Sequence, residues 1–346
     1  MSKFIPCSSD EIFKFINPKN NDILSDFNNS DLEELIYYIE NTYLRFRQRL
    51  GFDIDYTFGF EIEFEKSFNT DEIINKINSS LNKTWKYTFD ASLKRGGEII
   101  SPILNDVNSD WKSLRKVCQM ISENAKIGKN CGGHIHIGSS ILQNNSIYWL
   151  NFIKLWSAYE NVIFRFSYGE YINARKNIQK YAMPIANDLY NYYKKLIQLE
   201  SLNLMKILPY LNNQRNQAVN FQNVKVFAKF DNKIKNTIEF RCFNGTLEPT
   251  IWQNNLNLLL SLLEYSKSSN FNNELIDERI IKNLNENIEF SKYDDIYLDE
   301  ALELCDLIFN NNFDKVYFLR QYLKSFEINR KYNIKTENFV KKKHRF

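Results

Sequence analysis

The sequence predicts an α+β fold, in which helices interrupt an antiparallel sheet and a mainly helical C-terminal part follows it. Several short segments alternate apolar and polar residues with the period of two that a strand requires. The longer segments between and after them place apolar residues at helical spacing. No linker rich in Pro, Gly or Ser and no internal repeat divides the chain, so we expect the strands to belong to one domain.

The first element that we expect is a helix over residues 30–50. Ser30 is a suitable N-cap, Glu33 completes a capping box, and Gly51 follows as a stop signal. The period then changes in YTFGFEIEFE, residues 56–65, where aromatic and aliphatic side chains occupy one face. The other face carries glutamates, and this alternation predicts a strand.

Residues 85–101 predict two extended segments, WKYTFD and EIIS, joined by a turn around Gly96 and Gly97. A helix is expected from Ser109 onward, because its apolar residues recur at helical spacing. The segment CGGHIHIG, residues 131–138, then predicts a strand that holds two of the three histidines of the chain.

Two long aromatic-rich helices are expected over residues 146–168 and 186–206. Residues 218–230 alternate again, and residues 237–243, TIEFRCF, predict another strand. Residues 250–327 are expected to be mainly helical.

Composition argues against several classes of protein. The net charge of +3 gives no general case for nucleic-acid binding, and the basic run at residues 341–345 is typical of a solvated tail. The five cysteines have unrelated spacings, which favours reduced thiols in a cytoplasmic protein. The most apolar helix, residues 147–166, is interrupted by charged side chains, so we expect it to be buried rather than to span a membrane.

Polar faces on three predicted strands suggest a site. Each strand places two polar side chains on one face: Glu61 with Glu63, His134 with His136, and Glu239 with Arg241. Glu98 follows the glycine turn of a fourth extended segment. Any one of these faces is also typical of the solvated side of an open antiparallel sheet.

Convergence of these faces in a cleft would require cations. Carboxylates about 4–5 Å apart repel by roughly 3–4 kcal/mol at an effective dielectric constant near 20. Arg241 supplies one positive charge, and a divalent metal ion would supply more. Several carboxylates with one or two imidazoles favour Mg²⁺ or Mn²⁺ over Zn²⁺.

The segments FGFEIEFE, FDASL with GGEIISPIL, GGHIHIG and TIEFRCFNGTLEP follow one another between about residue 56 and about residue 255. In this order and spacing they resemble the amidoligase family, a branch of the carboxylate–amine ligase superfamily that contains glutamine synthetase and glutamate–cysteine ligase. The resemblance implies a glutamine-synthetase-like curved antiparallel sheet with the active site in its concavity. It also implies a catalytic domain over residues 51–270, between an N-terminal helical lead (1–50) and a helical C-terminal extension with a basic tail (271–346).

The resemblance further implies a role for each polar residue. Mg²⁺ or Mn²⁺ ions that bridge the phosphates of ATP would have five ligands: Glu61, Glu63, Glu98, His134 and Glu239. Arg241 would neutralise the phosphoryl group in transfer, and His136 and Arg215 would contact phosphate or substrate. Asp90 either orients or deprotonates the amine, or only caps the turn at Ala91 and Ser92.

The leading hypothesis is therefore an ATP-dependent ligase that joins a carboxylate to an amine through an acyl phosphate, with an amino acid or peptide as substrate. The alternative is a metal-dependent hydrolase or oxygenase that uses His134, His136 and one carboxylate. A silent scaffold is a third class, but it would be expected to lack ligands, and every acidic position is present. Neither the substrates nor the oligomeric state can be deduced from the sequence.

Overall fold

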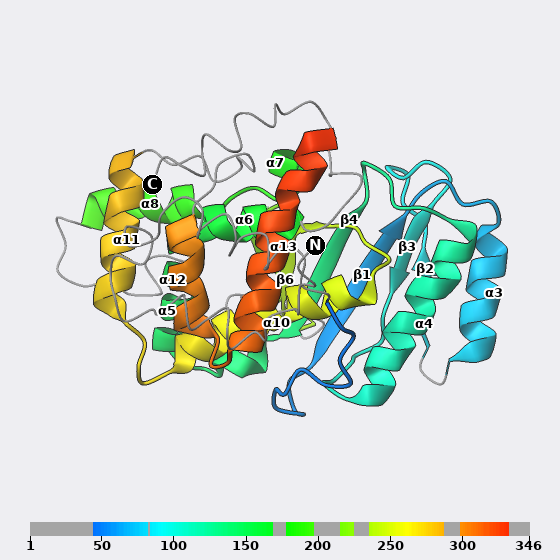
Figure 1. Ribbon diagram of the computed structural model, residues 1–346, viewed down its shortest axis with the longest axis horizontal. Coiled ribbons are helices and arrows are strands. Elements are labelled where there is room, and N and C mark those ends of the chain that lie inside the picture. Colours follow the sequence, from blue (N-terminus) through cyan, green and yellow to red (C-terminus); the bar gives the residue numbers. More distant parts are fainter. Residues whose placement is uncertain are drawn as a thin grey trace, which may run out of the picture.

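The computed structural model describes residues 44–81, 84–168, 178–196, 215–224, 235–286 and 298–331. Within them, an antiparallel sheet lies beside a group of helices, which confirms the α+β prediction (Figure 1). The six strands follow the order β2-β3-β1-β4-β6-β5. Their bounds are β1 Phe58–Phe64, β2 Lys86–Thr88, β3 Gly97–Ile100, β4 Gly132–Gly138, β5 Val219–Asn220 and β6 Thr237–Asn244. The sheet is not strongly curled (Figure 1), so the pronounced curvature implied by the resemblance is not seen.

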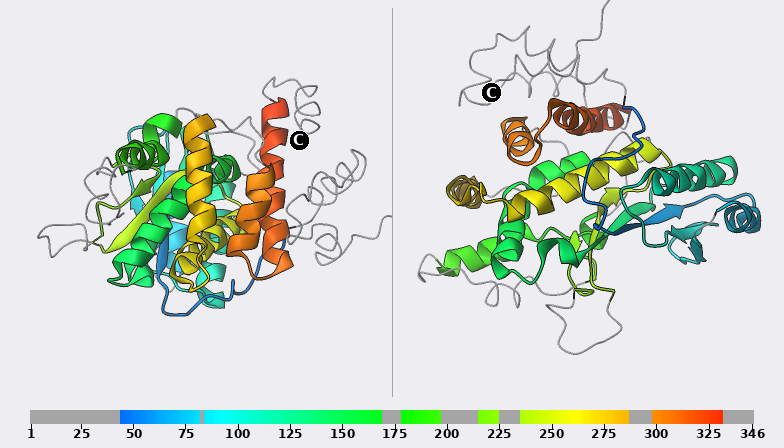
Figure 2. Two further views of the ribbon diagram at one scale, coloured as in Figure 1. Left: turned by 90° about the vertical axis from the view of Figure 1, so that its left-hand side faces the viewer. Right: turned by 90° about the horizontal axis from the view of Figure 1, so that it is seen from below.

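Some helices of the described residues pack against the sheet, and the others form a group beside it (Figure 1). Figure 2 shows α12 and α13 lying outside α10, away from the sheet. The mainly helical C-terminal part is confirmed. The helical bounds are α3 Thr70–Ser80, α4 Asn108–Asn124, η1 Ser139–Leu142, α5 Ser146–Ala158, α6 Glu160–Tyr168, α7 Ile178–Tyr181, α8 Ala186–Leu196, α10 Pro249–Lys267, α11 Asn273–Glu286, α12 Leu298–Ile308 and α13 Asn312–Lys331.

The apolar face of the sheet packs against α4, α5 and α10 through aromatic pairs. The ring centroids of Phe58 and Trp111 of α4 are 5.3 Å apart, and those of Phe60 and Trp252 of α10 are 5.0 Å apart. Phe240 of β6 lies 5.5 Å from Trp156 of α5. Burial of such large side chains fixes which face of each strand points to the core, and the polar residues are left together on the opposite face.

The predicted helix over residues 30–50 is wrong where the structure describes it. Residues 44–50 are not helical, and residues 30–43 lie outside the described part. The reason is that side chains from distant segments accept the backbone N–H groups of this stretch. Arg47 donates to Gln253 Oε1, while Leu50, Gly51 and Phe52 donate to the carboxylate of Asp106.

The other elements depart from the prediction mainly at their ends. The expected helix over residues 146–168 divides at Tyr159 into α5 and α6. The described part of the expected 186–206 helix is α8, and the described part of the 218–230 strand is the short β5. Helix α3 was not predicted, although Asn69 caps it and its buried Ile73 and Ile77 lie one turn apart.

One hydrophobic core connects the sheet with the C-terminal helices, from Phe58 to Leu323. The domain boundaries after residues 50 and 270 stay predictions. Among the described residues, no helix combines the length and the apolar character that a membrane crossing requires.

Asp106 is the side chain that ties the segment before β1 to helix α4. It is fully buried, and each of its two oxygens accepts two N–H groups. Oδ1 accepts the Leu50 backbone N–H and the Trp111 indole N–H, and Oδ2 accepts the backbone N–H groups of Gly51 and Phe52. Asp106→Asn turns one oxygen into a donor that faces other donors, so we expect the free energy of unfolding to fall by about 2–4 kcal/mol in urea titrations. The exposed Asp55→Asn should change it by less than about 0.5 kcal/mol, and an equal effect of both would contradict this role.

Candidate active site

Strand register brings the predicted polar residues together on one face of the sheet. Glu63 of β1 lies opposite Glu98 of β3, and Glu61 of β1 lies opposite His134 of β4. On the other side of β4, His136 lies opposite Glu239 of β6. Directly opposite residues have Cβ atoms about 4.5–5.5 Å apart, so these polar side chains are in contact range. Alternation along each strand predicts which residues share a face, and the strand pairing brings those polar faces together.

A β-bulge in β6 lies at the centre of this face. Gly133 pairs with Phe243 and Ile135 with Phe240, so β6 has one residue more than β4 over this stretch. Arg241 and Cys242 both lie opposite His134 as a result. Bulges bend the strand and redirect side chains, and here the bulge lies at Arg241.

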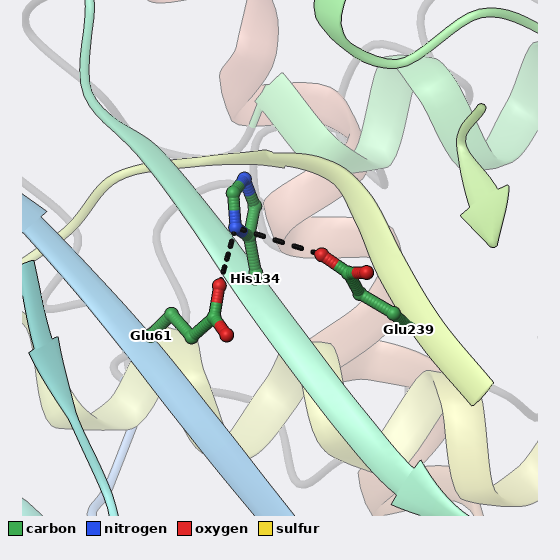
Figure 3. Close-up of side chains that lie close together, drawn as sticks. All are labelled: Glu61, His134 and Glu239. Carbon is green, nitrogen blue, oxygen red and sulfur yellow. Dashed lines mark hydrogen bonds and ion pairs between the residues drawn. The ribbon is translucent and has the colours of Figure 1, made fainter. Parts of the chain in front are cut away.

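The first group of possible metal ligands, the imidazole cluster, consists of Glu61, His134 and Glu239, one from each of three adjacent strands (Figure 3). One ligand atom from each residue lies within 4.8 Å of those of the other two. His134 Nδ1 is 2.8 Å from Glu61 Oε2 and 3.9 Å from Glu239 Oε1.

The second group, the acidic cluster, consists of Glu63, Asp90 and Glu98, whose ligand oxygens also lie within 4.8 Å of one another. Glu63 Oε2 accepts the backbone N–H of Gly132. Asp90 Oδ1 accepts the backbone N–H of Ser92 at 2.7 Å, so Asp90 caps its turn and faces the cluster at the same time. The predicted site residue Asp90 is therefore beside two predicted metal ligands.

His134 joins the two clusters. Its side chain is only 4% exposed, and its Nε2 lies 3.6 Å from Glu63 Oε1. This buried nitrogen has no hydrogen-bond partner. A buried polar atom without a partner is costly, and it is directed toward a carboxylate of the neighbouring cluster.

Glu61 lies between both histidines. Its Oε1 is 2.8 Å from His136 Nε2, while Oε2 contacts His134. Burial by itself raises the pKa of Glu61, but the hydrogen bonds from the two imidazoles outweigh burial and hold the pKa well below its usual value. This carboxylate is therefore ionised throughout the physiological range.

Glu98 has the opposite shift. Burial raises its pKa to about 7, and the negative charges of Glu61, Glu63 and Asp90 add to the effect. Arg241 opposes the shift without cancelling it. The acidic cluster thus carries more negative charge than its protein surroundings neutralise.

Arg241 lies beside the imidazole cluster and pairs with Glu239 Oε1 through Nη1. Its Nε donates to the backbone oxygen of Tyr181, the last residue of α7, at 3.4 Å. By contrast, Arg215 is exposed, and no hydrogen bond or ion pair joins it to either cluster within the described part of the chain. The predicted role of Arg215 stays a prediction.

Asn220 is a buried polar residue of this face that the sequence analysis missed. Its Nδ2 donates to Glu239 Oε2 at 2.8 Å. The available signal was its position in the alternating 218–230 segment, which puts Asn220 on the face opposite Val219 and Phe221.

The donor set fits hard divalent cations. The two clusters together offer five carboxylates and one imidazole, and oxygen-rich sets of this kind suit Mg²⁺ or Mn²⁺. Two features call for additional positive charge: the raised pKa of Glu98 and the unpartnered Nε2 of His134. Among the described residues, neither cluster includes His136, which disfavours a site built on both histidines.

A family model described as “Putative amidoligase enzyme” matches residues 71–263. The match contains Asp90, Glu98, both histidines of β4 and the Glu239–Arg241 pair, whereas Glu61 and Glu63 of β1 precede it. Its range is thus shifted toward the C-terminus relative to the stretch from about 56 to about 255 expected from the motifs. No curated protein sequence matches the chain.

Stability should reveal the protonation of Glu98. The native pKa of about 7 exceeds the ordinary 4.5, so the folded protein keeps a proton that the unfolded chain loses, and stability falls as pH rises through this window. Glu98→Gln cannot ionise. In buffer with a chelator we expect its free energy of unfolding to match wild type near pH 4.5 and to exceed it by about 1–2 kcal/mol at pH 8, since solvent screens part of the interaction. If the two proteins differed in free energy of unfolding by the same amount at both pH values, the ionisation of Glu98 would not be the cause.

Proposed function

The chain belongs to the amidoligase family, and from this premise we propose that it is an ATP-dependent ligase that forms an amide bond between a carboxylate and an amine. We further propose an acyl-phosphate intermediate and an amino acid or peptide as substrate. The six-stranded antiparallel sheet with its site on one face is compatible with a glutamine-synthetase-like fold that has little curvature.

The observation that carries this proposal is the close approach of two ligand clusters on one face of the sheet. The imidazole cluster and the acidic cluster would each hold one divalent cation, with His134 between them. Cations bound there would supply positive charge to the phosphates of ATP. Glycine-rich phosphate loops of the P-loop type are not found in the sequence, which agrees with phosphate binding through cations and arginine.

Asp90 is better suited to hold a cation than to act as a base. One of its oxygens accepts the Ser92 N–H, and its carboxylate lies with those of Glu63 and Glu98. Three carboxylates so close together can share the charge of one cation. A general base would instead have to be directed at the nitrogen of the amine substrate. We therefore assign Asp90 to the acidic cluster as its third ligand.

Arg241 is suited to the phosphoryl group. Its guanidinium lies beside Glu239 at the bulge, so it can face an anion that is held by the cations. A guanidinium offers parallel N–H donors that match two oxygens of a phosphate. In the proposed reaction, the substrate carboxylate oxygen attacks the γ-phosphorus and ADP leaves. The amine nitrogen then attacks the acyl carbon, phosphate leaves, and the nitrogen loses a proton.

Trapping of the intermediate tests this function. A carboxylate is a poor acyl donor until phosphorylation gives it a leaving group, so hydroxylamine should intercept the acyl phosphate. With Mg²⁺, ATP and a panel of amino acids and short peptides, we expect a hydroxamate and ADP in equal amounts, and neither product in excess chelator. Formation of AMP and pyrophosphate would replace the acyl phosphate by an acyl adenylate. Hydroxamate without ATP would instead support a hydrolase.

Arg241→Lys should lower kcat by at least about tenfold although the charge is retained, because an ammonium ion cannot provide the paired donors of a guanidinium. The rate of ADP formation measures this effect. Arg115→Lys is a suitable control, since Arg115 lies on α4, which packs on the apolar face of the sheet. Equal rates for both variants would remove Arg241 from the phosphate site.

A further inference from the structure

We propose that Asn220 is a positioning residue that holds the Glu239 carboxylate in the orientation required for cation binding by the imidazole cluster. This inference rests on the proposed function, because it assumes a divalent cation at Glu61, His134 and Glu239. It adds a residue from β5, an edge strand that carries none of the proposed ligands.

The position of Asn220 follows from strand pairing. Among the described strands, β5 pairs with β6 alone, and Asn220 lies directly opposite Glu239. The neighbouring pair, Val219 and Phe240, points into the core. Asn220 is 2% exposed, so its side chain is fixed between the two strands on the polar face.

The amide of Asn220 has one possible orientation. Its Oδ1 lies 2.9 Å from the backbone nitrogen of Gln222, which can only donate. The Nδ2 end must therefore face Glu239, and it donates to Oε2 at 2.8 Å. Because the amide cannot turn without losing both hydrogen bonds, Asn220 presents a permanent donor to the carboxylate.

This donor determines how Glu239 is shared. Arg241 takes Oε1, and Asn220 takes Oε2. Arginine and a carboxylate readily form a bidentate pair that uses both oxygens. With the Asn220 amide at Oε2, the carboxylate is turned so that Arg241 contacts only Oε1, which lies 3.9 Å from His134 Nδ1.

Removal of the amide should thus release Glu239 toward Arg241 and away from His134. Partners that orient metal ligands in this way are typically worth 10–100-fold in metal affinity. The acidic cluster contains neither Glu239 nor any partner of Asn220, so its affinity should not change. A positioning role predicts weaker metal affinity at the imidazole cluster alone, whereas a general structural role predicts weaker affinity at both clusters.

The test is a Mn²⁺ titration of the full chain by calorimetry, with free Mn²⁺ followed by electron paramagnetic resonance. Wild type should bind two equivalents of Mn²⁺. Asn220→Ala should weaken one of them by about 10–100-fold and leave the other unchanged. Asp90→Asn should weaken the other equivalent instead, which assigns the two sites.

Asn283→Ala is the matched control. Asn283 is buried to a similar extent and donates to Ala158 O and Tyr190 Oη. It belongs to α11, which lies at the opposite end of the molecule from β1 and β3 (Figure 1). It should lower the melting temperature while both Mn²⁺ affinities stay at the wild-type level. Two unchanged affinities in Asn220→Ala would overturn this inference alone. Absence of Mn²⁺ binding by wild type would overturn the cation sites of the proposed function and this inference together.

Discussion

Repulsion among carboxylates on one face of the sheet is the constraint on which the rest of the site depends. Two unit charges 4.8 Å apart repel by about 3–4 kcal/mol at an effective dielectric constant of about 20. The strands that carry these side chains are fixed relative to one another, because their aromatic face packs under α4, α5 and α10. A core that fixes the register thus maintains a local excess of negative charge.

The protein relieves this repulsion differently in its two halves. In the imidazole cluster, hydrogen bonds from His134 and His136 lower the pKa of Glu61. In the acidic cluster, burial and the charges of the neighbouring carboxylates raise the pKa of Glu98 to about 7, and among the described residues no hydrogen-bond donor offsets this shift. The two clusters therefore present different charge to a ligand near neutral pH, although they lie side by side on the same sheet.

Alternation predicted which residues share a face, because a strand has a fixed period of two. Glu61, Glu63, His134 and Glu239 were found in this way. Alternation cannot predict register, so neither the bulge at Arg241 nor the pairing of Asn220 with Glu239 could be deduced. The non-helical course of residues 44–50 was missed for a related reason, since its backbone partners lie at Asp106 and Gln253, far along the chain.

Strand β5 lies at one edge of the sheet formed by the described strands. The residues just before β5 also have a backbone partner outside the sheet, because Met183 donates to the Asn216 oxygen and accepts from the Ala218 N–H. Strand β5 supplies the amide that divides Glu239 between Arg241 and the imidazole cluster. The imidazole cluster is consequently coupled to the pairing of β5 with β6, whereas the acidic cluster depends on β1 and β3 inside the sheet and on the turn after β2. Loss of the pairing between β5 and β6 would therefore disturb the imidazole cluster and leave the acidic cluster intact.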